Sequence, residues 1–155
     1  MFQQKQSGFT LLELIVAFTI ATLLVTMSTP MVMRMYDSMV YRGAVKDMVS
    51  AIETTRYAAI TQGQAIDITI VPTDNAFQVG QGENNYLPKS LKLTIEAAQE
   101  MSEIKGAGTI RYYPDGSSSG GSIQILRPSG QGVILHVDWL LGRLTQQPYD
   151  YLSNG

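Results

Sequence analysis

The sequence predicts an α+β protein in which a long N-terminal helix packs on an antiparallel β-sheet or β-sandwich head. Three observations predict this class. Residues 9–33 are apolar almost without interruption, and residues 34–62 repeat hydrophobic side chains every three or four positions. From residue 64 the hydrophobic period changes to two, which is typical of strands with one buried face.

The apolar run, Phe9 to Met33, contains 25 residues with a single charge, Glu13, and one proline, Pro30. It is long enough to span the roughly 30 Å hydrocarbon core of a bilayer. The polar residues 1–8 precede it and carry one basic side chain, Lys5, which favours a cytoplasmic N-terminus. We predict a leader at 1–8, then a helix over 9–33 that lies in a membrane or a filament core.

Two simpler interpretations of this run fit less well. A secretory signal peptide has a shorter apolar region and a small-residue cleavage site after it, whereas here the small residue, Gly8, comes first. A plain anchor does not explain Glu13, because a carboxylate at the centre of a spanning helix costs about 2.5–3.5 kcal/mol. Pro30 cannot donate to the helical ladder and predicts a kink, whether or not bending has a role.

The helix is expected to continue over residues 34–62 as an amphipathic segment. Val45, Met48, Val49 and Ile52 follow the i, i+3, i+4, i+7 spacing of one helical face. Gln62-Gly63 is a suitable end for the helix.

The predicted head, residues 63–155, contains segments that alternate apolar and polar side chains. The expected strands lie at 66–70, 91–95, 110–113, 123–126 and 133–139. Turn-rich segments separate them, at 72–75, 80–85 and 128–132. The Gly- and Ser-rich stretch 114–122 is expected to be a mobile hairpin between two of these strands.

Composition excludes several kinds of chemistry. The chain has no cysteine and a single histidine, His136, so it can form neither a disulfide nor a multi-histidine zinc site. His136 is expected to face solvent on a strand. Residues 63–155 carry six basic and nine acidic side chains, which makes the head a poor partner for nucleic acid. We find no catalytic constellation, and we expect no enzyme activity, cofactor, metal or small-molecule substrate.

The segment Ser7-Gly8-Phe9-Thr10-Leu11-Leu12-Glu13-Leu14 resembles the processing site of type IV pilins and pseudopilins. The resemblance implies that a prepilin peptidase cuts after Gly8 and methylates the new amino group of Phe9. It also implies that Glu13 pairs with the Phe9 amine, in its own chain or a neighbour's, inside a filament core. Such a pair would favour the correct register of an incoming subunit, because an unpaired buried carboxylate is costly.

Residues 110–125 and 137–144 resemble the C-terminal half of H-type minor pseudopilins (GspH) and FimT-like minor pilins. This implies a minor subunit at or near the tip of the periplasmic pseudopilus of a type II secretion system, which helps export folded proteins. Its partners would be the prepilin peptidase, the inner membrane and other pseudopilins. The helix would be anchored in the inner membrane, with the head in the periplasm.

Two alternatives remain at this stage. The first is a minor type IV pilin for pilus priming or DNA uptake. DNA-binding relatives are expected to have a Gly-Arg-x-Arg element, but here Thr145 replaces the second arginine of Gly142-Arg143-Leu144-Thr145 and the head is net acidic. The second is a membrane-tethered enzyme or binding protein, which would require a pocket constellation that the sequence does not reveal.

Overall fold

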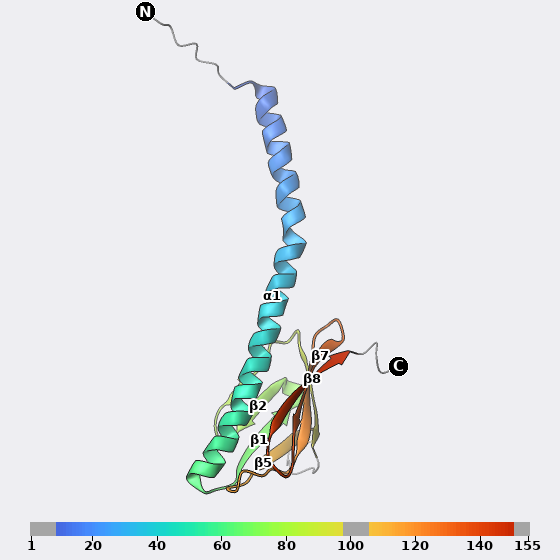
Figure 1. Ribbon diagram of the computed structural model, residues 1–155. Helices are drawn as coiled ribbons and strands as arrows, with labels where there is room; N and C mark the ends of the chain where they lie inside the picture. The colour runs from blue at the N-terminus through green and yellow to red at the C-terminus, as the bar shows by residue number, and fades with distance from the viewer. Residues whose placement is uncertain (1–8, 98–105, 151–155) are drawn as a thin grey trace, which may run out of the picture. The chain divides into compact units, whose positions relative to one another are not determined.

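A computed structural model describes residues 9–97 and 106–150. The chain divides into two compact units, residues 1–39 and 40–155. Helix α1, Leu11–Gln62, supplies the first unit and begins the second (Figure 1). It ends where Gly63 adopts a φ of +65°, a left-handed conformation that favours glycine and stops the helical ladder.

The second unit contains eight strands and one short 3₁₀ turn, η1 (Pro72–Asp74). In chain order the strands are β1 (Ile66–Val71), β2 (Ala76–Val79), β3 (Asn84–Tyr86), β4 (Lys92–Ala97), β5 (Gly108–Tyr112), β6 (Gly121–Leu126), β7 (Gln131–Val137) and β8 (Leu144–Asp150). They form two four-stranded sheets, in the orders β3-β2-β1-β5 and β4-β6-β7-β8. Every pairing is antiparallel, so the predicted fold class is confirmed.

The register of β1 shows how alternation builds the first sheet. Ile68 lies opposite Ile110 of β5, and both side chains are fully buried. Asp67 lies opposite Arg111, whose guanidinium donates to both carboxylate oxygens at 2.6 and 2.8 Å. The two faces of β1 therefore have different environments: the side chains of one face pack in the core, and those of the other form a bidentate ion pair.

One hydrophobic core joins the head segment of α1 to both sheets. Met48 and Ile52 of the predicted helical face are buried, and Val45 and Val49 pack beside them. A buried side chain of this size contributes about 1.5–3 kcal/mol. Arg127, which follows β6, lies over the ring of Tyr41 of α1 at 4.0 Å from the centroid, a cation–π contact that joins helix to sheet.

The expected hairpin pairing of strands 110–113 and 123–126 is wrong, although a local turn within the segment 114–122 brings Ser118 into an antiparallel bridge with Tyr112. The strands on either side of the segment, β5 and β6, belong to different sheets, so it is a crossover. Hydrogen bonds hold it in place: Arg111 N–H donates to the Ser119 hydroxyl at 3.0 Å, and Ser118 N–H donates to the carbonyl of Trp139 at 2.9 Å. Gly116, Ser118 and Gly120 are buried, which is unlike the surface of a mobile hairpin.

The expected strand 133–139 has the right length but is displaced by two residues, because β7 runs from Gln131 to Val137. Val133, Leu135 and Val137 point into the core as predicted, but β7 ends at Val137 and Trp139 lies in an exposed turn. No strand was predicted at β2 or β8, and β3 overlaps the expected turn at 80–85. β3 and β8 are edge strands with mostly polar side chains, so neither has an apolar face to alternate.

Candidate functional site on the N-terminal segment and on the head

The first turn of α1 carries the residues of the predicted processing and assembly site. Thr10 caps the helix: its hydroxyl accepts from the backbone N–H of Glu13 at 3.3 Å, and its carbonyl accepts from the same N–H at 3.1 Å. Thr10 and Glu13 thus have the spacing of a capping box. Phe9 is 80% exposed just before the helix, while Gly8 lies outside the described residues. The Thr10 cap was missed, although the Thr-x-x-Glu spacing could have revealed it.

The helical surface from Leu11 to Val25 is apolar on every side. Its large hydrophobic side chains are about half to four-fifths exposed within this single chain. The hydroxyls of Thr19 and Thr22 donate to carbonyls four residues earlier, at 2.7 and 2.6 Å, so they need no external partner. A helix that is apolar all round belongs in a core or a membrane, and Glu13 is the charged group it carries there.

Among the described residues, no helix is both long and apolar enough to cross a bilayer. The predicted membrane-spanning role of residues 9–33 therefore stays a prediction. At Pro30 the backbone is helical, and its side chain lies outside the described part, so the kink also stays a prediction.

On the head, the turn after β7 presents three large apolar side chains to solvent. Trp139, Leu140 and Leu141 are 66%, 59% and 57% exposed. The Asp138 carboxylate accepts from the N–H groups of Leu140 and Leu141 at 3.0 and 2.7 Å, and this arrangement fixes the turn. We call residues 139–141 the apolar turn.

Two neighbours hold the apolar turn against the rest of the head. The Ser118 hydroxyl donates to the carbonyl of Asp138 at 2.9 Å. Arg56 of α1 donates from Nη2 to the carbonyl of Leu141 at 3.0 Å, and from Nε to that of Gly116 at 3.2 Å. The Gly-Arg element that the sequence singled out, Gly142-Arg143, follows directly, with Arg143 exposed.

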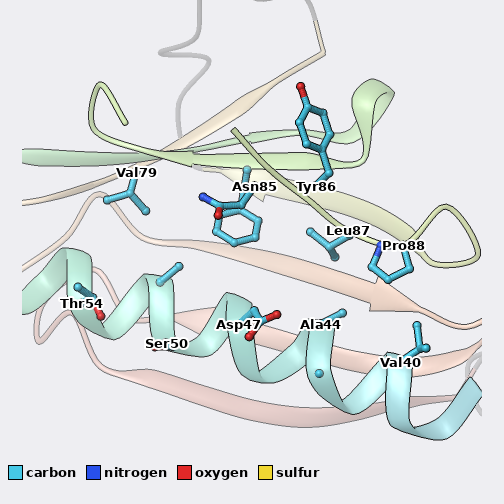
Figure 2. A pocket seen from close by; sticks show the side chains of 13 residues that line it. Val40, Ala44, Asp47, Ser50, Thr54, Val79, Asn85, Tyr86, Leu87 and Pro88 are labelled. Atoms are coloured by element: carbon cyan, nitrogen blue, oxygen red, sulfur yellow. The ribbon is translucent and has the colours of Figure 1, made fainter. Parts of the chain in front are cut away.

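A groove of about 680 Å³ lies between α1 and the strands β2 and β3 (Figure 2). Apolar groups line most of it: Val40, Ala44, Phe77, Val79, Leu87 and Pro88. Of the described residues that line the groove, Asp47 alone carries a charge, and its side chain is exposed. Sequence reasoning missed this groove because its two walls are about 30 residues apart in the chain.

In the described part of the chain, no three His, Asp or Glu side chains lie close enough together to bind a metal ion. His136 faces solvent, as predicted, and its Nδ1 lies 3.0 Å from the Ser122 hydroxyl across the β6–β7 pair. Glu96 of β4 lies opposite Ser122 in the register of the second sheet, but within residues 9–97 and 106–150 no hydrogen bond joins a carboxylate to the imidazole, as a nucleophile–base–acid triad would require.

Two family models match this chain, one at its N-terminal end and one over the head. The model of the family "Type II transport protein GspH" matches residues 44–140, which is most of the head. The chain belongs to the GspH family. The model of the "Prokaryotic N-terminal methylation motif" matches residues 3–29, which include Gly8, Phe9 and Glu13. These matches confirm the predicted resemblance and the predicted function as an H-type minor pseudopilin.

One curated relative and two solved structures show the extent of the likeness. Type II secretion system protein H of Xanthomonas campestris pv. campestris is 24% identical over 146 residues, covering 94% of this GspH-family chain and 86% of the relative. The fold is similar to that of the minor pseudopilin EpsH of Vibrio cholerae, with a TM-score of 0.56, 12% identity and coverage of 69% and 95%. It is also similar to that of the type IV minor pilin FimU of Pseudomonas aeruginosa, with a TM-score of 0.54, 14% identity and coverage of 70% and 88%.

Proposed function

We propose that this GspH-family chain is a minor subunit of the pseudopilus of a type II secretion system, made as a precursor and clipped between Gly8 and Phe9. One observation carries the proposal: a methylation motif at residues 3–29 precedes a GspH head at 44–140 in a single chain. The helix would anchor the subunit in the inner membrane, with its head in the periplasm, at or near the pseudopilus tip. There the head would help export folded proteins as an adaptor for other pseudopilins, without catalysing a reaction.

The proposed processing step concerns the bond between Gly8 and Phe9. A prepilin peptidase would remove residues 1–8 and methylate the Phe9 amine. Intact-mass spectrometry of the chain from cells with and without the peptidase tests this. We expect the loss of residues 1–8 and the gain of one methyl group, both only when the peptidase is present.

Matched variants make this test specific. Gly8→Val should block processing, whereas Gly43→Val should leave it intact, because Gly43 lies far along α1 from the cleavage site and a Cβ added there meets no atom within 4 Å. A full-length mass from the unaltered chain in cells that contain the peptidase would overturn the proposal.

The proposed role of Glu13 is to pair with the methylated Phe9 amine during assembly. Its position on an otherwise apolar helical surface supports this role, because a carboxylate in a dry helix bundle needs a cation. Glu13→Gln should be processed normally yet enter pseudopili at least about tenfold less well, since breaking a buried pair costs more than the 1.4 kcal/mol of one decade. Glu53→Gln, at an exposed head position of the same helix, is the matched control.

A deletion strain separates the proposal from a role as a minor type IV pilin. We expect folded proteins to be lost from the culture supernatant while surface pili remain. Loss of pili with normal secretion would favour the pilin role instead. The likeness to FimU, at 14% identity, shows the fold and favours neither role.

A further inference from the structure

Besides the groove of Figure 2, the head contains a smaller pocket of about 320 Å³, which we call the Tyr112 pocket. Near its C-terminal end, helix α1 contributes Glu53 and Arg56 to the lining, and the residues that follow the apolar turn contribute Gly142 and Arg143. The groove and the Tyr112 pocket share no residue. The pocket is therefore a separate site, formed where the helix meets the connection between β7 and β8.

The phenol of Tyr112 lies in the wall of this pocket, fully buried and without a hydrogen-bond partner among the described residues. Buried polar groups are nearly always paired in folded proteins, so an unpaired one needs an explanation. Burial raises the pKa of Tyr112, and the charge of Arg56 lowers it while that of Glu53 raises it, which places the hydroxyl near both side chains. The phenol therefore keeps its proton at neutral pH and can donate a hydrogen bond to a group that enters the pocket.

The charges of the Tyr112 pocket favour an anion. Two arginines, Arg56 and Arg143, and one glutamate, Glu53, give its lining a net charge of +1. Arg56 donates from Nε and Nη2 to backbone carbonyls, whereas its Nη1 makes no hydrogen bond within the described residues. Arg56, Arg143 and Tyr112 thus bring unused donors to one pocket, and a carboxylate is an acceptor that can bind several of them at once.

Exposed apolar side chains adjoin this polar centre. Tyr57 and Ile60 of α1 line the pocket and are 70% and 46% exposed, and the apolar turn leads directly into Gly142 and Arg143. Apolar groups around a charged contact exclude water from it and so strengthen it. A free anion would leave these side chains exposed, whereas an acidic side chain on the apolar surface of another protein would both enter the pocket and cover them.

We propose that the Tyr112 pocket receives an aspartate or glutamate side chain of a different pseudopilin, with Arg56, Arg143 and the Tyr112 hydroxyl donating to its carboxylate. The inference deepens the proposed function and rests on it, because a minor subunit at or near the tip has other pseudopilins as its neighbours. Residues 63–155 carry nine acidic and six basic side chains, which disfavours the phosphates of nucleic acid as the occupant.

A carbodiimide tests this contact, because it joins a carboxylate to a lysine amine, with loss of one water, only when the two groups touch. Arg143→Lys places an amine at the pocket, and Glu53→Gln, present in every sample, removes the carboxylate of this chain that lines the same pocket. The full-length chain is treated in membranes from cells that contain the complete secretion system. Tandem mass spectrometry should find an amide between the new lysine and an acidic residue of a second protein that has its own N-terminal methylation motif.

Matched variants show whether the phenol takes part. Tyr112→Phe should lower the yield of this amide at least about tenfold, because the carboxylate loses a hydrogen bond from a neutral donor to a charged acceptor. The head should stay folded, since the hydroxyl has no partner within the described residues of the free chain. Tyr86→Phe, at an exposed position outside the pocket, should leave the yield unchanged. Arg42→Lys, exposed elsewhere on α1, should give no such amide in place of Arg143→Lys.

Each other outcome would overturn the proposal. No amide at this position, or an equal yield from Tyr112→Phe, would show that the pocket does not hold a partner's carboxylate. An amide to a second copy of this chain would assign the pocket to self-association. Retention of a DNA oligonucleotide by the parent chain, lost in Tyr112→Phe, would assign it to phosphate. Intact mass of the same samples reports cleavage after Gly8, so a missing contact in a normally processed chain would overturn this inference and leave the proposed function intact.

Discussion

The guanidinium of Arg56 donates a hydrogen bond to the carbonyl oxygen of Leu141 at 3.0 Å, across 85 positions of the chain. The same side chain donates to Gly116 at 3.2 Å, so one helical residue holds both the crossover between the sheets and the apolar turn. At the other end of the head segment of α1, Arg127 lies on Tyr41. The helix is thus attached to the sheets by an arginine contact near each end, with the hydrophobic core between them.

Replacing Arg56 with lysine should destabilise the head, because a single ammonium cannot reproduce the two directed bonds of the guanidinium. We expect a loss of about 1–2 kcal/mol in the free energy of unfolding, and a midpoint temperature lower by about 2–8 °C. Thermal and denaturant unfolding of the full chain in detergent would measure this. The control is Arg42→Lys, at an exposed position of the same helix. Equal stability of Arg56→Lys and the parent chain would contradict a stabilising role for the two hydrogen bonds of Arg56.

Gly142 should tolerate no side chain. Its φ is +58°, and a Cβ there would collide with the carbonyl oxygen of Gly116 and crowd Arg56. We expect Gly142→Ala to cost more than about 3 kcal/mol, the left-handed backbone alone accounting for about 1–2 kcal/mol. Gly63→Ala has a similar φ of +65° but open space around it, so it should cost only the backbone part. Denaturant unfolding of both variants compares them, and equal losses would show that the predicted collision is relieved.

Tyr112 is fully buried, and among the described residues its hydroxyl has no hydrogen-bond partner. Burying such a group costs about 1–3 kcal/mol. Tyr112→Phe should therefore leave stability unchanged or raise it by about 1 kcal/mol, measured by denaturant unfolding. Tyr57→Phe, at an exposed position of α1, is the matched control and should change little. A clear loss of stability in Tyr112→Phe alone would show that the hydroxyl has a partner.

The same phenol predicts a dependence on alkaline pH. Burial raises the pKa of Tyr112 above its ordinary value of 10.0. The free energy of unfolding is therefore unaffected by the ionisation of Tyr112 below pH 10. It falls as the pH rises further, because the phenol ionises more readily in the unfolded chain than in the folded chain. Unfolding curves at pH 9–11 should show a smaller loss in Tyr112→Phe than in the parent chain. Identical curves would contradict the raised pKa.

Asp115 accepts two hydrogen bonds from Ser117, from its hydroxyl at 2.6 Å and from its backbone N–H at 3.0 Å. These bonds lower the pKa of Asp115 below its ordinary value of 3.8, the hydroxyl contributing most. The stability they provide is present above that value and is lost as the pH falls through the lowered pKa. In an NMR titration, Ser117→Ala should move the pKa of Asp115 up toward 3.8, whereas Ser129→Ala should not. An unchanged value in Ser117→Ala would contradict this cause.

Local patterns predicted most of the elements that the structure contains. The face of α1 with Met48 and Ile52 enters the core, and β1 alternates as its isoleucines required. These features follow from a single periodicity over neighbouring residues, which a sequence displays directly. Strands without an apolar face, such as β8, display no such pattern and were missed.

The choice of partner for each strand depended on contacts far apart in the chain. The segment 114–122 has the composition of a hairpin, but β5 pairs with β1 and β6 pairs with β4 and β7. The exposed turn at Trp139 likewise ends β7 because Asp138 caps the following backbone and Arg56 holds it from the helix. Neither outcome could be read from neighbouring residues alone.

The sequence alone therefore identified a helix that is apolar all round, with one carboxylate near its start, and a β-rich head of the H-type pseudopilin family. These properties depend on composition and short-range spacing, which persist whatever the chain packs against. Only the tertiary structure decided that the head divides into two sheets and that Arg56 donates hydrogen bonds both to the crossover between them and to the apolar turn. It also decided that the apolar groove and the apolar turn are formed by different residues. Each of these arises where segments distant in the chain meet, and the free energy of such contacts depends on geometry that no single segment contains.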